Sequence, residues 1–181
     1  MQKPFWKFSK KGRLKLQKDF KSIINSLKNI GIKIIVVPLV DNGKIENKFQ
    51  NEVLIDFFLK IEKMLKKNNQ RIAFETDKNP TQTVELLKIL NSKVFGINYD
   101  IGNSASLGYD HKDELNAYGR RVINVHVKDK VLNGTTVSLG EGNASFKIVF
   151  SLLKKFKYNG NYILQTARSK NKQHSKVLKK Y

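Results

Sequence analysis

Four polar side chains stand at or near the ends of short apolar segments, where apolar packing alone would not place them. They are Glu75 in RIAFETD, Asp100 in INYDIGN, His126 in INVHVKD and Gln165 in YILQTAR. If each segment is a strand of one parallel sheet, the four residues lie at one end of that sheet, because parallel strands of a barrel end on the same face. Carboxylate, imidazole and amide groups together can hold a divalent ion such as Mn²⁺, Mg²⁺ or Zn²⁺.

Each of these residues, taken alone, has an ordinary structural explanation. An acidic residue at a strand end often caps the following helix, and a lone histidine in a strand is often a hydrogen-bonded core residue. The hypothesis of a site rests on the joint arrangement, in which three ionisable groups follow three apolar runs. Chance placement explains that combination poorly.

The elements that would position these residues alternate along the chain. Short apolar runs are followed by longer segments of helical periodicity, which is typical of parallel strands joined by helices. Strands are expected at 33–39, 72–75, 94–100, 122–127, 136–139 and 162–166, and helices at 19–27, 50–65, 81–90, 112–118 and 146–156. The pattern predicts an α/β fold. Residues 169–181 are expected to form a short basic helix or a frayed end, and His111 and His174 are expected at the surface.

Length and composition favour one soluble, cytoplasmic domain over residues 1–181. The absence of cysteine excludes disulfides and thiolate metal sites. No apolar run is long enough to span a membrane, and the lysine-rich start lacks the apolar stretch of a signal peptide. The net charge is +20, but much of it lies in residues 1–20 and 168–181, and no nucleic-acid recognition motif accompanies it. Nucleic-acid binding is therefore not expected, and polyanion binding is a minor alternative.

A series of motifs in order along the chain resembles a known family. These are GIKIIVVPLVDNG, FETDKNP, INYDIGNSASLGYD, RVINVHVKDK and VSLGEGNASFKIVFSLLKKFKYNGNYILQTAR. The series is similar to the xylose isomerase-like TIM barrels of the sugar-phosphate isomerase and epimerase group. Within that group it is most similar to L-ribulose-5-phosphate 3-epimerase and hexulose-6-phosphate isomerase. The strongest parts of the resemblance are residues 100–103 and 126–129.

The resemblance implies a partial (β/α)8 TIM barrel. At roughly 250 residues for a whole barrel, 181 residues correspond to about the last six βα units, with the first two strands absent. A complementary N-terminal chain or a homo-oligomer would then complete the barrel. Open strand edges at both ends of the sheet predict that the isolated chain is poorly soluble or self-associates.

The resemblance also implies a reaction and the residues that perform it. A divalent ion (Mn, Mg, Zn or Co) would be held by Glu75, Asp100, His126 and residue 165, while Glu75 and residue 165 move protons on a sugar or sugar phosphate. Substrate contacts are expected from Asn103, Lys128, Asp129, Glu141 and Arg168. Residue 165 is glutamine, whose amide cannot accept and return a proton near neutral pH. The alternative is therefore a catalytically impaired remnant or a binding protein of the same fold.

Overall fold

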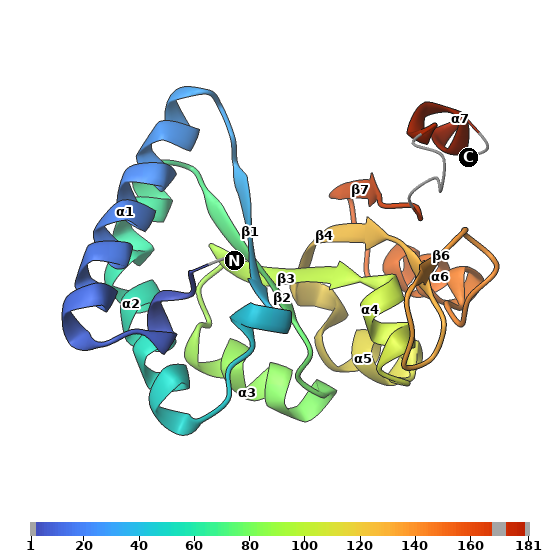
Figure 1. Cartoon of the computed structure of the whole chain (residues 1–181), viewed down its shortest axis with the longest axis horizontal. Coiled ribbons are helices and arrows are strands. Elements are labelled where there is room, and N and C mark those ends of the chain that lie inside the picture. Colours follow the sequence, from blue (N-terminus) through green and yellow to red (C-terminus); the bar gives the residue numbers. More distant parts are fainter. Residues whose placement is uncertain (1–2, 168–172, 180–181) are drawn as a thin grey trace. The chain divides into compact units, whose positions relative to one another are not determined.

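The structure is a computed structural model that describes residues 3–167 and 173–179 (Figure 1). Its main sheet has five strands in the order β1-β2-β3-β4-β7. The chain divides into two compact units, Met1–Ile97 and Asn98–Tyr181, and strand β3 (Phe95–Asp100) contributes residues to both. Among the described helices, none is both long and apolar enough to cross a bilayer.

The first unit alternates helices with the first strands of the sheet. Its elements are η1 (Phe5–Lys7), α1 (Lys10–Asn29), β1 (Ile34–Leu39), η2 (Asp41–Gly43), α2 (Lys48–Lys67), β2 (Arg71–Thr76) and α3 (Pro80–Ile89). Strand β1 pairs with β2 in parallel from Ile34↔Arg71 to Leu39↔Thr76. Strand β2 pairs with β3 in parallel from Ile72↔Phe95 to Phe74↔Ile97.

An aromatic cluster fills the core of the first unit. Phe5 and Trp6 are buried, and the Phe5 ring lies 4.6 Å from the ring of Phe57 on α2, measured between centroids. The ring of Phe58, also on α2, packs edge-on at 4.9 Å against Phe74 of β2. The N-terminal segment is thus anchored to α2, and α2 is anchored to the strand that carries Glu75.

The second unit begins with the end of β3 and contains the remaining elements. These are α4 (Ile101–Ser106), α5 (His111–Tyr118), η3 (Gly119–Arg121), β4 (Val122–Val127), β5 (Asp129–Lys130), β6 (Thr136–Val137), α6 (Phe146–Lys155), β7 (Asn161–Leu164) and α7 (His174–Leu178). Strand β4 pairs with β7 in parallel from Asn124↔Asn161 to Val127↔Leu164. The short helix expected in the C-terminal segment is present as α7.

One expected strand does not join the parallel sheet. Residues 136–139 were expected to form a strand of the barrel, but only Thr136–Val137 is extended, and it pairs antiparallel with β5 through Lys130↔Thr136. The chain reverses through a tight turn in which Asn133 has a positive φ of 53° and Gly134 donates to the carbonyl of Val131. The two strands of this hairpin form a separate small sheet. The main sheet of the described residues therefore has five strands rather than the six expected.

A buried polar network corrects the expectation that His111 lies at the surface. His111, the first residue of α5, is only 6% exposed, and its Nδ1 lies 2.7 Å from the Tyr99 hydroxyl. Both Tyr99 and Ser104 donate to Glu114 Oε2, and Tyr118 donates to Oε1 at 2.8 Å. The histidine is buried because the hydroxyl groups around a buried carboxylate also solvate the imidazole. His174 is exposed, as expected.

Candidate metal centre

Asp100 ends β3 and connects three parts of the second unit. Its Oδ1 accepts a hydrogen bond of 2.8 Å from the backbone N–H of Asn103, which caps the N-terminus of α4. Its Oδ2 lies 2.8 Å from Lys128 Nζ and 3.6 Å from His126 Nδ1. The carboxylate is 1% exposed. One oxygen therefore holds the helix, while the other meets two nitrogen-bearing side chains.

The pKa of Asp100 reflects this surrounding. Burial raises the pKa of the carboxyl group, but the contacts with His126 and Lys128 lower it further than burial raises it. The pKa of Asp100 therefore lies below its ordinary value. The side chain is ionised at neutral pH, which is the state that a metal ligand requires.

His126 is held on β4 by amide side chains that point to the same face of the sheet. Its Nδ1 lies 3.1 Å from Asn98 Nδ2, and Asn98 Oδ1 accepts a hydrogen bond of 2.6 Å from Asn124 Nδ2. All three residues are buried. Asn98 and Asn124 were not predicted from the sequence, although each stands two positions before a predicted ligand and so faces the same side of its strand.

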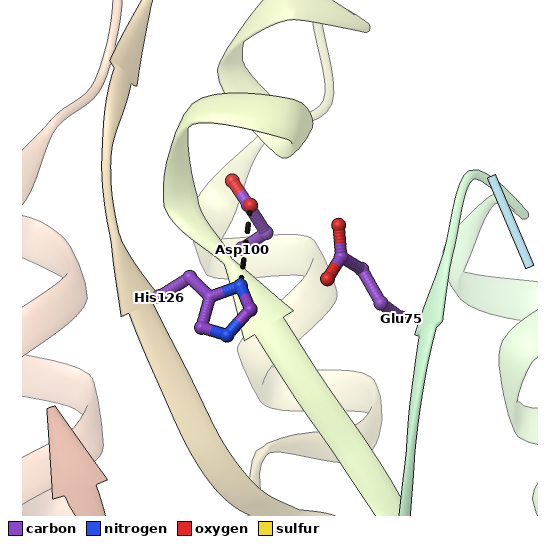
Figure 2. A group of neighbouring side chains, drawn as sticks. All are labelled: Glu75, Asp100 and His126. Carbon is purple, nitrogen blue, oxygen red and sulfur yellow. Dashed lines mark ion pairs between the residues drawn. The ribbon is translucent and has the colours of Figure 1, made fainter. Parts of the chain in front are cut away.

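Glu75 lies near the end of β2 and is half-buried. The chain turns sharply after it, because Asn79 and Gln82 form a capping box and Pro80 occupies the start of α3. In Figure 2, Glu75 is drawn with Asp100 and His126, and the dashed line marks the ion pair between the latter two. Each of the three offers one potential ligand atom, and these atoms lie within 4.8 Å of one another.

This donor set fits a divalent ion. Two carboxylates and an imidazole supply oxygen and nitrogen atoms of the kinds that Mn²⁺, Mg²⁺ and Zn²⁺ accept. Asp100 Oδ2 is buried and already faces the positive charge of Lys128 Nζ at 2.8 Å, so this oxygen suits a cation. The residues present therefore suit the ion that the resemblance implies.

Gln165 follows the last residue of β7 and is half-buried. Its backbone N–H donates to the carbonyl of Val127 at 2.9 Å, which continues the pairing of β7 with β4. Together with Lys128 it lines a cavity of about 660 Å³. The other residues of the lining are Thr135, Thr136, Leu164, Thr166, Ala167 and His174.

Asp129, for which substrate contact stays a prediction, has a fully buried side chain whose oxygens face the loop that precedes α6. Oδ2 accepts hydrogen bonds of 2.9 Å from the N–H groups of Gly140 and Gly142, and Oδ1 accepts one of 3.1 Å from Ala144. A side chain at Gly142 would overlap Asp129 Oδ1. Asp129 therefore binds this loop tightly.

The other residues expected to contact substrate have different surroundings. Asn103 is half-buried, and its Oδ1 lies 3.5 Å from Lys130 Nζ. Glu141 is exposed on the loop that Asp129 holds. Arg168 lies outside the described residues. Substrate contact by these residues stays a prediction.

Comparison with known proteins decides the family. The sequence profile of the xylose isomerase-like TIM barrel family matches residues 3–181. The chain belongs to this family. The resemblance inferred from the motifs and the α/β barrel fold expected from it are both confirmed.

One curated relative of the chain carries the name of a sugar-phosphate epimerase. A putative L-ribulose-5-phosphate 3-epimerase from Haemophilus influenzae is 30% identical over 92 residues, which are 47% of this chain and 32% of that protein. The chain spans only about a third of the curated relatives it matches, 36% and 32% of their lengths.

Solved structures with the same fold include a metal-bound protein and a sugar epimerase. The IolI protein with a bound zinc atom has a TM-score of 0.77 at 19% identity, with 96% of this chain and 69% of that chain covered. A D-psicose 3-epimerase in the presence of D-fructose has a TM-score of 0.77 at 12% identity, with 98% of this chain and 65% of that chain covered. At these identities the likeness concerns the fold.

Proposed function

We propose that this chain carries the metal-binding part of a sugar or sugar-phosphate isomerase or epimerase. The observation that carries the proposal is the group formed by Glu75, Asp100 and His126, whose potential ligand atoms lie within 4.8 Å of one another. A divalent ion bound there would polarise a substrate carbonyl and stabilise the negative charge that develops on its oxygens. Isomerisation or epimerisation through an enediolate uses this chemistry, because that route removes a proton from a carbon beside a carbonyl group.

The residues of the group have different roles in this proposal. Asp100 and His126 hold the ion, since both are buried and held by hydrogen bonds to neighbouring groups. Glu75 is the general base, because it is a carboxylate that lies near the strand end and is only half-buried. A positioned base of this kind typically contributes about 10²- to 10⁴-fold in rate.

Gln165 favours a second candidate function. Isomerisation and epimerisation both require that a proton be returned to the substrate, and a glutamine amide cannot perform this step near neutral pH. A protein that binds the metal and the sugar without turning the sugar over would keep Glu75, Asp100 and His126 and tolerate Gln165. The two candidates differ in whether proton transfer occurs.

Exchange of substrate protons with solvent deuterium separates the two candidates. The chain is incubated in D₂O with Mn²⁺ and a panel of ketoses and ketose phosphates, and deuterium at the carbons beside the carbonyl is measured by mass spectrometry. An enzyme with Glu75 as its base exchanges the proton at one carbon, and Glu75→Gln abolishes this exchange. We expect Gln165→Glu to increase product formation by about tenfold or more, since it restores a second proton carrier.

The matched control is Gln173→Glu, the same chemical change at an exposed residue of the second unit. It should leave product formation unchanged. Exchange that survives Glu75→Gln would contradict the proposed base. Absence of exchange in the unmodified chain and in Gln165→Glu would favour the binding protein over the enzyme.

A further inference from the structure

We propose that Lys128 acts as an internal cation that competes with the divalent ion for Asp100 and so sets the metal affinity of the site. The inference rests on the proposed function, because it assumes that Asp100 is a ligand. It assigns to Lys128 a role in tuning ion binding, in place of the contact with substrate that was expected from the sequence.

The two oxygens of Asp100 leave only one position for a cation. Oδ1 is directed at the first turn of α4, where it accepts the hydrogen bond from the Asn103 N–H. Oδ2 is the oxygen that faces His126, and it is also the atom that Lys128 Nζ approaches to 2.8 Å. An ion that uses His126 and Asp100 together must therefore use the oxygen that the ammonium group contacts.

The position of Lys128 is enforced by its neighbours. A Cβ atom at Gly102 would lie 2.9 Å from Lys128 Cγ and 3.1 Å from the Lys128 backbone carbonyl carbon, so a larger residue there would require the lysine or α4 to shift. The next residue, Asp129, is fixed by three backbone N–H groups. The lysine side chain is only 16% exposed. The ammonium group is thus held beside Asp100 by packing as well as by charge.

An ammonium group and a divalent ion repel each other strongly at such distances, and burial strengthens the repulsion. Binding of the ion therefore requires Lys128 Nζ to leave Asp100 Oδ2. Space for this movement exists, because Lys128 also lines the cavity of about 660 Å³ beside Gln165. The free energy of breaking the lysine contact is subtracted from that of ion binding, which lowers the affinity.

Direct measurement of ion affinity tests the inference without any assay of activity. Mn²⁺ is titrated into the unmodified chain, Lys128→Met and Lys130→Met, and free Mn²⁺ is followed by electron paramagnetic resonance. We expect Lys128→Met to bind Mn²⁺ about tenfold more tightly or better, because one positive charge beside the ligand oxygen is removed. Lys130→Met removes the same charge two residues away, where Nζ lies 3.5 Å from Asn103 Oδ1, and should change the affinity little.

Each other outcome contradicts the inference in a distinguishable way. Equal affinities in all three proteins would overturn the role of Lys128 and leave the metal site standing. An equal gain in both variants would reveal a general charge effect and would also overturn it. No binding by any of the three would overturn the inference and the proposed metal site together. Circular dichroism checks that the variants fold. A second variant, Lys128→Gln, keeps a polar side chain without the charge and should shift the Mn²⁺ affinity in the same direction as Lys128→Met.

Discussion

Asp100 connects the backbone of α4, the imidazole of His126 and the ammonium group of Lys128 through a single buried carboxylate. Substitution of this residue would therefore disturb both the start of a helix and the candidate metal centre. Asparagine is the least disruptive replacement, because it keeps an oxygen for the helix cap and removes the charge.

Gly102 is predicted to control how closely Lys128 approaches α4. Gly102→Ala should destabilise the protein by about 1–3 kcal/mol, because the added methyl group meets the lysine stem and backbone at 2.9 and 3.1 Å. Urea denaturation measures the change. Gly12→Ala is the control, since a Cβ there meets Phe8 at an ordinary 3.4 Å and alanine favours a helix by up to about 1 kcal/mol. If Gly102→Ala were neutral or stabilising, as Gly12→Ala is expected to be, the contact between Lys128 and α4 would not be tight.

Residue types and spacing were enough to suggest Glu75, Asp100 and His126 as members of a site. They were not enough to identify the contact between Lys128 and Asp100, because it depends on the absence of a side chain at Gly102. His111 was misplaced for a similar reason. Its burial depends on Tyr99 and Glu114, which lie 12 residues before it and 3 after it and meet only when α5 packs on the sheet.

At the scale of elements, the loop before α6 is predicted to depend on Asp129. Asp129→Asn replaces one carboxylate oxygen by an NH₂ group, which cannot accept the backbone N–H groups of the loop, and each lost hydrogen bond to a charged group costs about 1.5–3 kcal/mol. Hydrogen exchange should therefore quicken at Gly140, Gly142 or Ala144, whose N–H groups bond to Asp129.

The control for this prediction is Asp113→Asn, the same change at an exposed position of α5. It should leave exchange in the loop unaltered. If Asp129→Asn also left the exchange of these amides unaltered, the carboxylate would not be what holds the loop.

Strands and helices with long apolar periodicity were predicted from the sequence close to their observed bounds, as β4 and α3 illustrate. Other elements differed: the helix expected at 19–27 begins already at Lys10, and the short helix α4 was not predicted. A further error occurred where a short segment finds its partner through a turn. Residues 136–139 have the composition of a strand, but the turn at Asn133 and Gly134 directs them back onto β5. The packing of Phe5 and Trp6 on α2 was also not predicted, since two aromatic residues in a basic segment carry no periodic signal.

At the scale of the whole molecule, β1 and β7 stand at the two ends of the sheet order. Tyr162, Ile163 and Leu164 of β7 are 48%, 42% and 39% exposed, and no charged residue interrupts 158–167. Apolar strands of this kind tend to associate. Self-association of the chain stays a prediction, and completion of the barrel by another chain stays a proposal.

The binding of Mn²⁺ by the chain and by two aspartate variants tests directly whether Asp100 belongs to a metal centre. Asp100→Asn removes the proposed ligand charge and keeps the cap of α4, whereas Asp110→Asn makes the same change at the exposed cap of α5. We expect one Mn²⁺ per chain, with an affinity that falls about tenfold or more in Asp100→Asn and stays unchanged in Asp110→Asn. Equal binding by all three proteins would contradict the assignment of the metal centre to Asp100.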